Sequence, residues 1–224
     1  MGPSASSVSS SPSKMEALGG YPVKSSSLKA KRLTVLLSMT VGVGCLFLLQ
    51  TQLVKHRKPR DFYSFEVIDA KGRTFPLEKF RGKVSLVVNV ASYSDNTEAN
   101  YQFLQELHRE LGTSHFNVLA FPCGQFGDSE PGTSRDIEAY AKSAFGVTFP
   151  FFNKIRILGS EADPAFKFLT DSVQKTPKWN FWKFLVNTEG KVVRFWKNNE
   201  PMESVREEAR AMVREIILKK RVEL

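Results

Sequence analysis

Residues 83–96 have the sequence KVSLVVNVASYSDN, and a helical pattern follows them as far as Leu111. The apolar run from Val84 to Ala91 is short and rich in β-branched residues, which is typical of a strand buried on both faces. The small polar residues after it favour a turn and a helix N-cap. Apolar residues then recur at helical spacing and stop before Gly112, which predicts a helix that ends there.

This strand–turn–helix unit suits the activation of a nucleophile. The first N–H groups of a helix have no intrahelical partner and carry the positive end of the helix dipole. A thiol placed at such a turn would ionise easily. The turn contains no cysteine, however, and Ser94 stands at its centre. We expect Ser94 to act as an N-cap of the helix, a role worth about 1 kcal/mol.

Turn and cap signals divide the rest of the chain into further strands and helices. They are a hairpin with its turn at 69–72, a strand at 115–121, a helix at 134–145 capped by Ser134, a helix that starts at Asp163-Pro164, strands at 181–187 and 191–196, and a helix at 204–219. A strand–helix–strand unit requires a right-handed crossover and a parallel pair, and the late hairpin adds antiparallel strands. We therefore predict an α/β, thioredoxin-like fold with a mixed central sheet flanked by helices, preceded by one transmembrane helix.

The positive charge is concentrated in the first 60 residues. The chain of 224 residues has a net charge of +9, and residues 1–60 contain nine Lys or Arg side chains against the single acid Glu16. A nucleic-acid-binding domain would carry such an excess on a folded face, which argues against that function. Basic residues that flank an apolar segment are instead typical of a membrane protein.

The N-terminal segment divides into three parts. Residues 1–32 are rich in Ser, Pro, Gly and Lys, which predicts disorder. Residues 33–54 are uncharged and would extend about 33 Å as a helix, so we predict a single transmembrane span. A cleaved signal peptide or a buried core helix are the alternatives. Residues 55–60 form a basic linker, and a globular domain is expected over 61–218.

The chain has few side chains suited to a metal site or to a disulfide framework. It contains two cysteines, Cys45 and Cys123, which cannot form such a framework. Its three histidines form no cluster with ligand spacing, so no metal site is expected. His108 is expected on a helix surface and His115 at the start of a strand.

Four segments taken together resemble the glutathione peroxidase family. They are NVAS at 89–92, LAFPCGQFG at 119–127, VTFP at 147–150 and WNF at 179–181. Their order and spacing match the family across residues 61–218. The hydrophobic segment and the run WNFWKFLV at 179–186 are similar to the branch that is anchored in the endoplasmic reticulum membrane. The resemblance implies a monomer with a luminal C-terminal domain.

The resemblance also implies a set of site residues. In the family a peroxidatic Cys or selenocysteine attacks the peroxide and is then reduced by thiol, while Gln, Trp and Asn side chains hold the anion. Here Ser94 occupies the peroxidatic position and Ser129 the Gln position, whereas Trp179 and Asn180 match the family. Asp95 replaces the Gly that usually follows the nucleophile. No cofactor is implied, and glutathione or a protein dithiol would be the reducing co-substrate.

Two functions are compatible with this pattern. In the first, the protein is a thiol-dependent peroxidase that reduces hydrogen peroxide or hydroperoxides through Cys123, because Ser94 cannot form a sulfenic acid. Oxidoreductases similar to protein disulfide isomerase would then be its partners. In the second, it is an inactive pseudoperoxidase that acts as a luminal interaction module. Packing alone would also explain Cys123 at a strand end, and equally Trp179 and Asn180.

Residues 219–224 are expected to form a C-terminal tail. The tail ends in RVEL, which shares only its last two residues with the KDEL retrieval signal. It supports a luminal C-terminus only in combination with the predicted span and the family branch, and a solvated charged end is the alternative.

Overall fold

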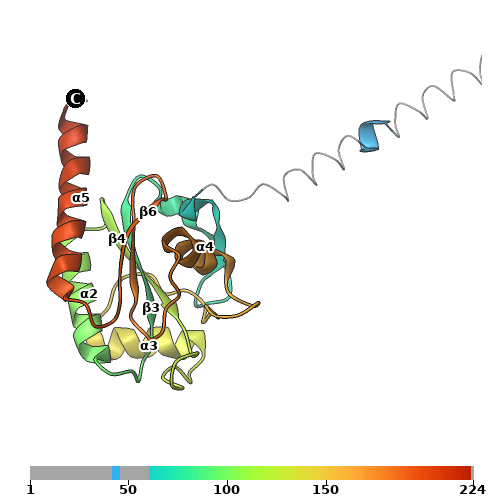
Figure 1. The fold of residues 1–224 in the computed structure, drawn as a ribbon, viewed down its shortest axis with the longest axis vertical. Helices are drawn as coiled ribbons and strands as arrows, with labels where there is room; N and C mark the ends of the chain where they lie inside the picture. The colour runs from blue at the N-terminus through green and yellow to red at the C-terminus, as the bar shows by residue number, and fades with distance from the viewer. Residues whose placement is uncertain (1–41, 46–60, 223–224) are drawn as a thin grey trace, which may run out of the picture. The chain divides into compact units, whose positions relative to one another are not determined.

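The computed structural model describes residues 42–45, which are helical, and residues 61–222, which form a domain (Figure 1). The elements of the domain are η1 (Phe62–Ser64), β1 (Glu66–Ile68), β2 (Thr74–Pro76), η2 (Leu77–Phe80), β3 (Val84–Val90), α2 (Thr97–Leu111), β4 (Phe116–Pro122), α3 (Ser134–Phe145), α4 (Pro164–Val173), β5 (Lys183–Val186), β6 (Val192–Trp196) and α5 (Met202–Val222). Among the described residues, no helix has both the length and the hydropathy needed to cross a bilayer. The predictions for residues 1–32 and 55–60, and for all but 42–45 of the span at 33–54, lie outside the described residues.

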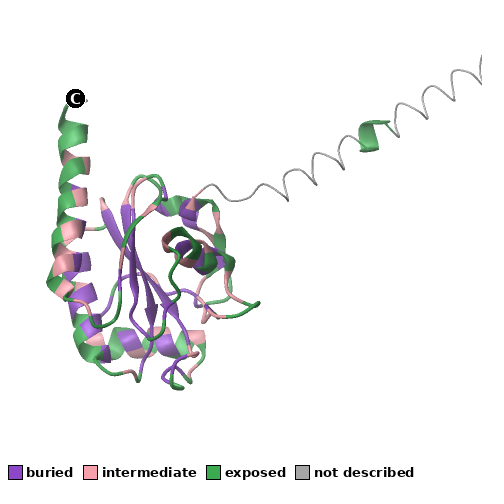
Figure 2. Cartoon of the chain, in the orientation of Figure 1, coloured by how far each residue is buried: buried purple, intermediate pink, exposed green. Residues whose placement is uncertain are grey.

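A mixed four-stranded sheet lies at the centre of the domain, in the order β4-β3-β5-β6. β3 pairs in parallel with β4 and antiparallel with β5, and β5 pairs antiparallel with β6. Every residue of β3 and of β4 is buried, as expected for strands covered on both faces (Figure 2). With the flanking helices this is the thioredoxin-like α/β arrangement that the sequence predicts.

Successive residues of β3 pack into two separate hydrophobic layers. Leu86 and Val88 face a cluster that also contains Leu104 of α2 and Val213 of α5. Val87 faces the opposite cluster, which contains residues of α4, η1 and η2. This alternation follows from the two-residue period of a strand. The sheet is therefore covered by α2, α3 and α5 on one face and by α4 and the N-terminal segment on the other (Figure 1).

Two predicted boundaries are wrong. The N-cap of α3 is Thr133 and not Ser134, because Thr133 and Asp136 form a reciprocal capping box. The Ser134 hydroxyl instead donates a hydrogen bond to Asn153 Oδ1. α5 continues to Val222, so most of the predicted tail at 219–224 is helical. No Gly or Pro lies between residues 202 and 222 to end the helix earlier.

A steric prediction concerns the turn between β5 and β6. Gly190 has a φ of +85°, and a Cβ on it would lie 2.6 Å from Asp61 Oδ1. Gly159 has the same φ, but a Cβ there would meet nothing within 4 Å. Both Ala variants lose about 1–2 kcal/mol of unfolding free energy from the left-handed backbone. Gly190→Ala should lose about 1–3 kcal/mol more because of the clash.

Urea unfolding of the two variants measures this difference. Equal losses for Gly190→Ala and Gly159→Ala would show that Asp61 does not pack against the turn.

Candidate functional site

The turn between β3 and α2 is present, but Ser94 does not cap the helix. α2 begins at Thr97, and its N-cap is Asn96, which has a left-handed φ of 63° and makes no side-chain capping bond. Thr97 organises the turn instead. Its hydroxyl accepts a hydrogen bond from the Ser94 N–H at 3.0 Å and lies 2.7 Å from Ser94 O and 3.1 Å from Ala91 O. The N-cap prediction is therefore wrong, because the chain turns once more before the helix begins.

The Ser94 side chain has no group beside it that would activate it. The residue is partly buried, and its hydroxyl oxygen is buried without a hydrogen-bond partner among the described residues. The neighbouring Asp95 is exposed. A serine hydroxyl needs an adjacent base to become a nucleophile at neutral pH, and the described residues supply none.

The structure brings Ser129, Asn180 and Trp179 together next to this turn. Asn180 Nδ2 donates to Ser129 Oγ at 3.1 Å, and the Ser129 hydroxyl in turn donates to the Phe126 carbonyl. The edge of the Trp179 ring lies against Gly127, where a Cβ would be 3.3 Å from the ring. The Tyr93 N–H donates to Ser129 O at 2.9 Å, which links the cluster to the Ser94 turn. Ser129, Trp179 and Asn180 therefore lie together beside the turn that contains Ser94, near the end of β3.

Asn89 holds the segment that carries Trp179 and Asn180. Its side chain donates to Trp179 O at 3.1 Å and accepts from the Trp182 N–H at 2.9 Å. Its backbone oxygen accepts from the Phe181 N–H at 2.7 Å. Asn89 is completely buried, so these bonds are shielded from water. The segment is thus fixed to the end of β3.

Cys123 does not belong to this cluster. Its side chain is fully buried in the hydrophobic layer that contains α4, on the face of the sheet opposite α2. Gln125 covers it, since the Gln125 Oε1 lies 3.9 Å from the Cys123 Sγ and accepts from the Ile157 and Leu158 N–H groups. Burial raises the pKa of the Cys123 thiol. A buried, protonated thiol is a poor nucleophile.

Sequence reasoning missed the role of the buried lysine Lys183. Its ammonium group donates to Asn100 Oδ1 at 2.8 Å and to Phe181 O at 2.9 Å. Asn100 Nδ2 donates to Asn96 O at 2.9 Å. Lys183 therefore ties the start of α2 to the segment that carries Trp179 and Asn180. Burial lowers its pKa to about 8.

Glu130 is a second buried charged residue that the sequence did not single out. Burial raises the pKa of its carboxyl to about 7, although the adjacent Ser92 and the charge of Lys154 oppose the shift. Neither carboxyl oxygen has a hydrogen-bond partner of normal geometry among the described residues. The Lys154 ammonium group donates instead to the backbone oxygens of Glu130 and Gly132. Only the fold reveals this placement, because a Glu in a Gly- and Pro-rich loop is usually exposed.

The described residues contain no group of three or more His, Cys, Asp or Glu side chains that could hold a metal ion. His108 is 4% exposed, which contradicts the expectation of a helix-surface residue. Its ring packs edge to face on Phe149, and burial lowers its pKa.

Comparison with known proteins decides the family. The glutathione peroxidase family model matches residues 62–170. A Tetraodon nigroviridis protein named probable glutathione peroxidase 8 is 77% identical over 94% of this chain and all of its own length. The human protein of that name is 57% identical over the same shares. The chain belongs to the glutathione peroxidase family.

A solved glutathione-peroxidase-type structure supports the fold. The crystal structure of T. cruzi GPX1 is 27% identical, with a TM-score of 0.56 over 69% of this chain and 97% of its own. The family resemblance of the four sequence segments is thus confirmed. Within this glutathione peroxidase domain, the side chain of residue 94 is a serine hydroxyl. The thiol of Cys123 lies in the hydrophobic layer that contains α4 and not at the Ser94 turn.

A pH-dependent stability is expected from Glu130. Its pKa is about 7 in the folded state, against about 4.3 for an unfolded glutamate, so folding binds a proton between these values. The free energy of unfolding should therefore fall as the pH rises from about 4.5 to about 7, by a contribution on the order of 2–3 kcal/mol. Glu130→Gln should remove this contribution.

Urea unfolding at several pH values compares the two proteins, with Glu207→Gln on the exposed face of α5 as a control. If the wild type and Glu130→Gln have parallel stability profiles, Glu130 is not held in a proton-binding environment.

Proposed function

We propose that the protein is an endoplasmic reticulum member of the glutathione peroxidase family that has kept the peroxidase scaffold without its peroxide-reducing cycle. A single span would anchor it in the membrane, and its luminal domain would act as an interaction module. The observation that carries the proposal is chemical. The side chain of residue 94 is a serine hydroxyl, and the only thiol of residues 61–222, that of Cys123, is fully buried.

The family's cycle depends on the chemistry of sulfur or selenium. The anion attacks the peroxide O–O bond, takes one oxygen to become a sulfenic or selenenic acid, and releases water or an alcohol. Two thiols then return the two electrons. A serine oxygen has no corresponding oxidation states. The retained Trp179 and Asn180 therefore have no sulfur anion to hold at residue 94.

The membrane and luminal parts of the proposal rest on sequence. The uncharged run at 33–54 has the length of a span, and basic residues flank it on both sides. The family resemblance favours the branch of the endoplasmic reticulum membrane. Relatives named probable glutathione peroxidase 8 align along 94% of this chain and all of their own length, so the N-terminal region is largely shared.

A second candidate is a slow thiol-dependent peroxidase that works through Cys123. The observation in its favour is the position of Cys123 just after β4, next to Gly124, in a chain of this family. Glutathione or a dithiol of a protein-disulfide-isomerase-like partner would have to supply the second thiol, because the domain has no other cysteine. The reaction would also require a local opening that exposes the sulfur.

Peroxide turnover separates the two candidates. With glutathione or reduced protein disulfide isomerase as the reductant, we expect the wild type and Cys123→Ser to consume hydrogen peroxide no faster than the same mixture without the protein. Ser94→Cys should gain measurable turnover, because its thiol would lie beside the start of α2 and the Asn180 cluster. Wild-type turnover that is lost in Cys123→Ser would instead establish the second candidate.

The accessibility of Cys123 gives an independent prediction. In a Cys45→Ala background, a soluble alkylating reagent should modify the folded protein at least about a hundredfold more slowly than the urea-unfolded protein, because the thiol is buried and protonated. Mass spectrometry measures the modified fraction over time. Similar rates in the two states would show that Cys123 is open to soluble partners.

A further inference from the structure

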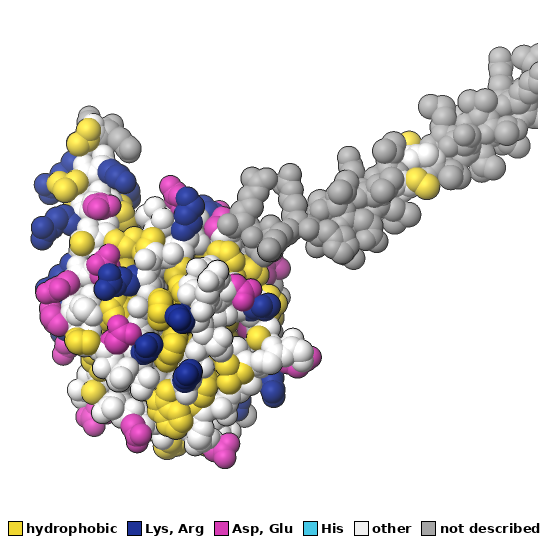
Figure 3. Space-filling view, viewed as in Figure 1, with side chains coloured by type: hydrophobic (Ala, Val, Ile, Leu, Met, Phe, Trp, Pro, Cys, Tyr) yellow, Lys and Arg dark blue, Asp and Glu magenta, His cyan; other side chains and the backbone are white. Residues whose placement is uncertain are grey.

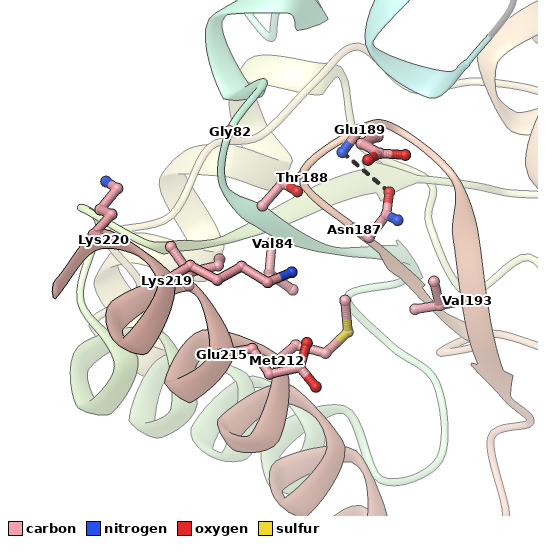
Figure 4. A pocket seen from close by; sticks show the side chains of 11 residues that line it. Gly82, Val84, Asn187, Thr188, Glu189, Val193, Met212, Glu215, Lys219 and Lys220 are labelled. Carbon is pink, nitrogen blue, oxygen red and sulfur yellow. Dashed lines mark hydrogen bonds between the residues drawn. The ribbon is translucent and has the colours of Figure 1, made fainter. Parts of the chain in front are cut away.

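A pocket of about 460 Å³ lies between α5 and the turn that joins β5 to β6 (Figure 4). Its apolar lining comes from three elements, with Val84 of β3, Val193 of β6 and Met212 of α5. Its rim carries charged groups from α5. The Lys219 side chain lies across the pocket, whereas Lys220 points away from it (Figure 4). The pocket therefore combines an apolar floor with a rim of mixed charge, because Glu189 and Glu215 line it together with Lys219 and Lys220.

The end of α5 beyond this pocket is both apolar and basic. Leu218 and Val222 lie one helical turn apart and are 53% and 88% exposed. The residues between them are Lys219, Lys220 and Arg221. Figure 3 shows hydrophobic and basic side chains side by side at this free end of the helix. Such a pattern is typical of a helix that lies at a membrane–water interface, where long basic side chains reach the head groups.

The basic groups at this end form no ion pair among the described residues, although Glu189 and Glu215 line the pocket beside Lys219 and Lys220. α5 forms its ion pairs in its first half, where Arg206 and Arg210 both contact Glu110. Within residues 61–222, neither Lys219 nor Lys220 forms a salt bridge. As far as the described residues go, the two ammonium groups therefore remain available to an anion.

The chain enters the domain beside the same pocket. The Phe62 N–H donates to Gly190 O at 2.9 Å, and the Gly82 N–H donates to Thr188 O at 3.0 Å. The first residues of the domain thus lie against the turn that lines the pocket. The predicted span ends at residue 54, and the six residues 55–60 can extend to about 20 Å at most. A membrane anchor would keep this end of the domain close to the bilayer.

We propose that the free end of α5, beside this pocket, docks on the bilayer surface that holds the anchor. Lys219 and Lys220 bind the phosphates of phospholipid head groups, and Leu218 and Val222 reach the boundary of the acyl chains. This inference rests on the membrane anchor of the proposed function. Charge complementarity and the short linker favour lipid over a protein partner.

Docking in this way sets the direction in which the Ser94 cluster faces. β3 starts at Val84 in the pocket and ends at Val90, next to the turn that contains Ser94. Seven residues of a strand extend about 23 Å. The cluster with Trp179 and Asn180 would therefore point away from the bilayer, where soluble partners reach it and membrane lipids do not.

Fluorescence quenching in vesicles tests the proposal. The full-length chain with Cys45→Ala is reconstituted in phosphatidylcholine vesicles that contain a minor fraction of phosphatidylserine and a lipid with a nitroxide on its head group. A thiol-reactive fluorophore is attached through Val222→Cys or, at the opposite end, through Tyr93→Cys, while Cys123 stays buried. The label at residue 222 should be quenched strongly and the label at residue 93 weakly.

Charge reversal gives the matched control. Lys219→Glu with Lys220→Glu should weaken docking by at least about fivefold per lysine and reduce the quenching at residue 222. Lys175→Glu with Lys178→Glu makes the same charge change beside another surface pocket and should leave the quenching at residue 222 unchanged.

The outcomes separate this inference from the proposed function. A protein that does not float with the vesicles has no anchor, so the membrane part of the proposed function fails together with the docking. A protein that floats but shows equal quenching at residues 93 and 222, or no quenching at residue 222, keeps its anchor and overturns the docking. Quenching that the Lys219 and Lys220 reversals leave unchanged also overturns it.

Discussion

The buried amide of Asn89 is the contact on which the arrangement of the site depends. It lies near the end of the central strand and bonds both the Trp179 carbonyl and the Trp182 N–H. A buried amide left without partners costs about 1–3 kcal/mol, so the segment between these residues cannot easily leave the strand. That segment delivers Asn180 to Ser129. The cluster is therefore held by backbone and amide contacts that do not involve residue 94.

This independence explains how the scaffold persists while its chemistry changes. In the proposed function, a serine oxygen at residue 94 cannot carry the redox step, yet none of the bonds that position Trp179 and Asn180 involves residue 94. Lys183 adds a second tie, because its ammonium group bonds both α2 and the Phe181 carbonyl. Cys123 is poorly placed to act as the peroxidatic thiol in place of residue 94. It lies beneath Gln125 in the hydrophobic layer that contains α4.

The sequence predicted the strands and helices well because their signals are local. The apolar runs at 84–91 and 115–121 became β3 and β4, and Gly112 ends α2 as expected. The sequence did not predict Asn96 as the N-cap of α2. The hydrogen bond from the Ser94 N–H to the Thr97 hydroxyl, which organises the turn, cannot be read from the spacing of residue types. The burial of Cys123 and of the Glu130 carboxyl depends on residues distant in sequence. Ser129 and Asn180 lie beside the Ser94 turn in the fold, but the site roles that the family resemblance implies for them and for Trp179 stay predictions.

The covalent state of the protein after contact with peroxide shows whether any side chain of the domain still performs the peroxidase step. The folded, purified chain is treated with hydrogen peroxide and then glutathione, and peptide mass spectrometry examines residues 94 and 123. We expect neither Ser94 nor Cys123 to carry added oxygen or glutathione, whereas the thiol introduced by Ser94→Cys should form a glutathione disulfide. A glutathione disulfide on Cys123 of the folded wild-type protein would contradict this expectation.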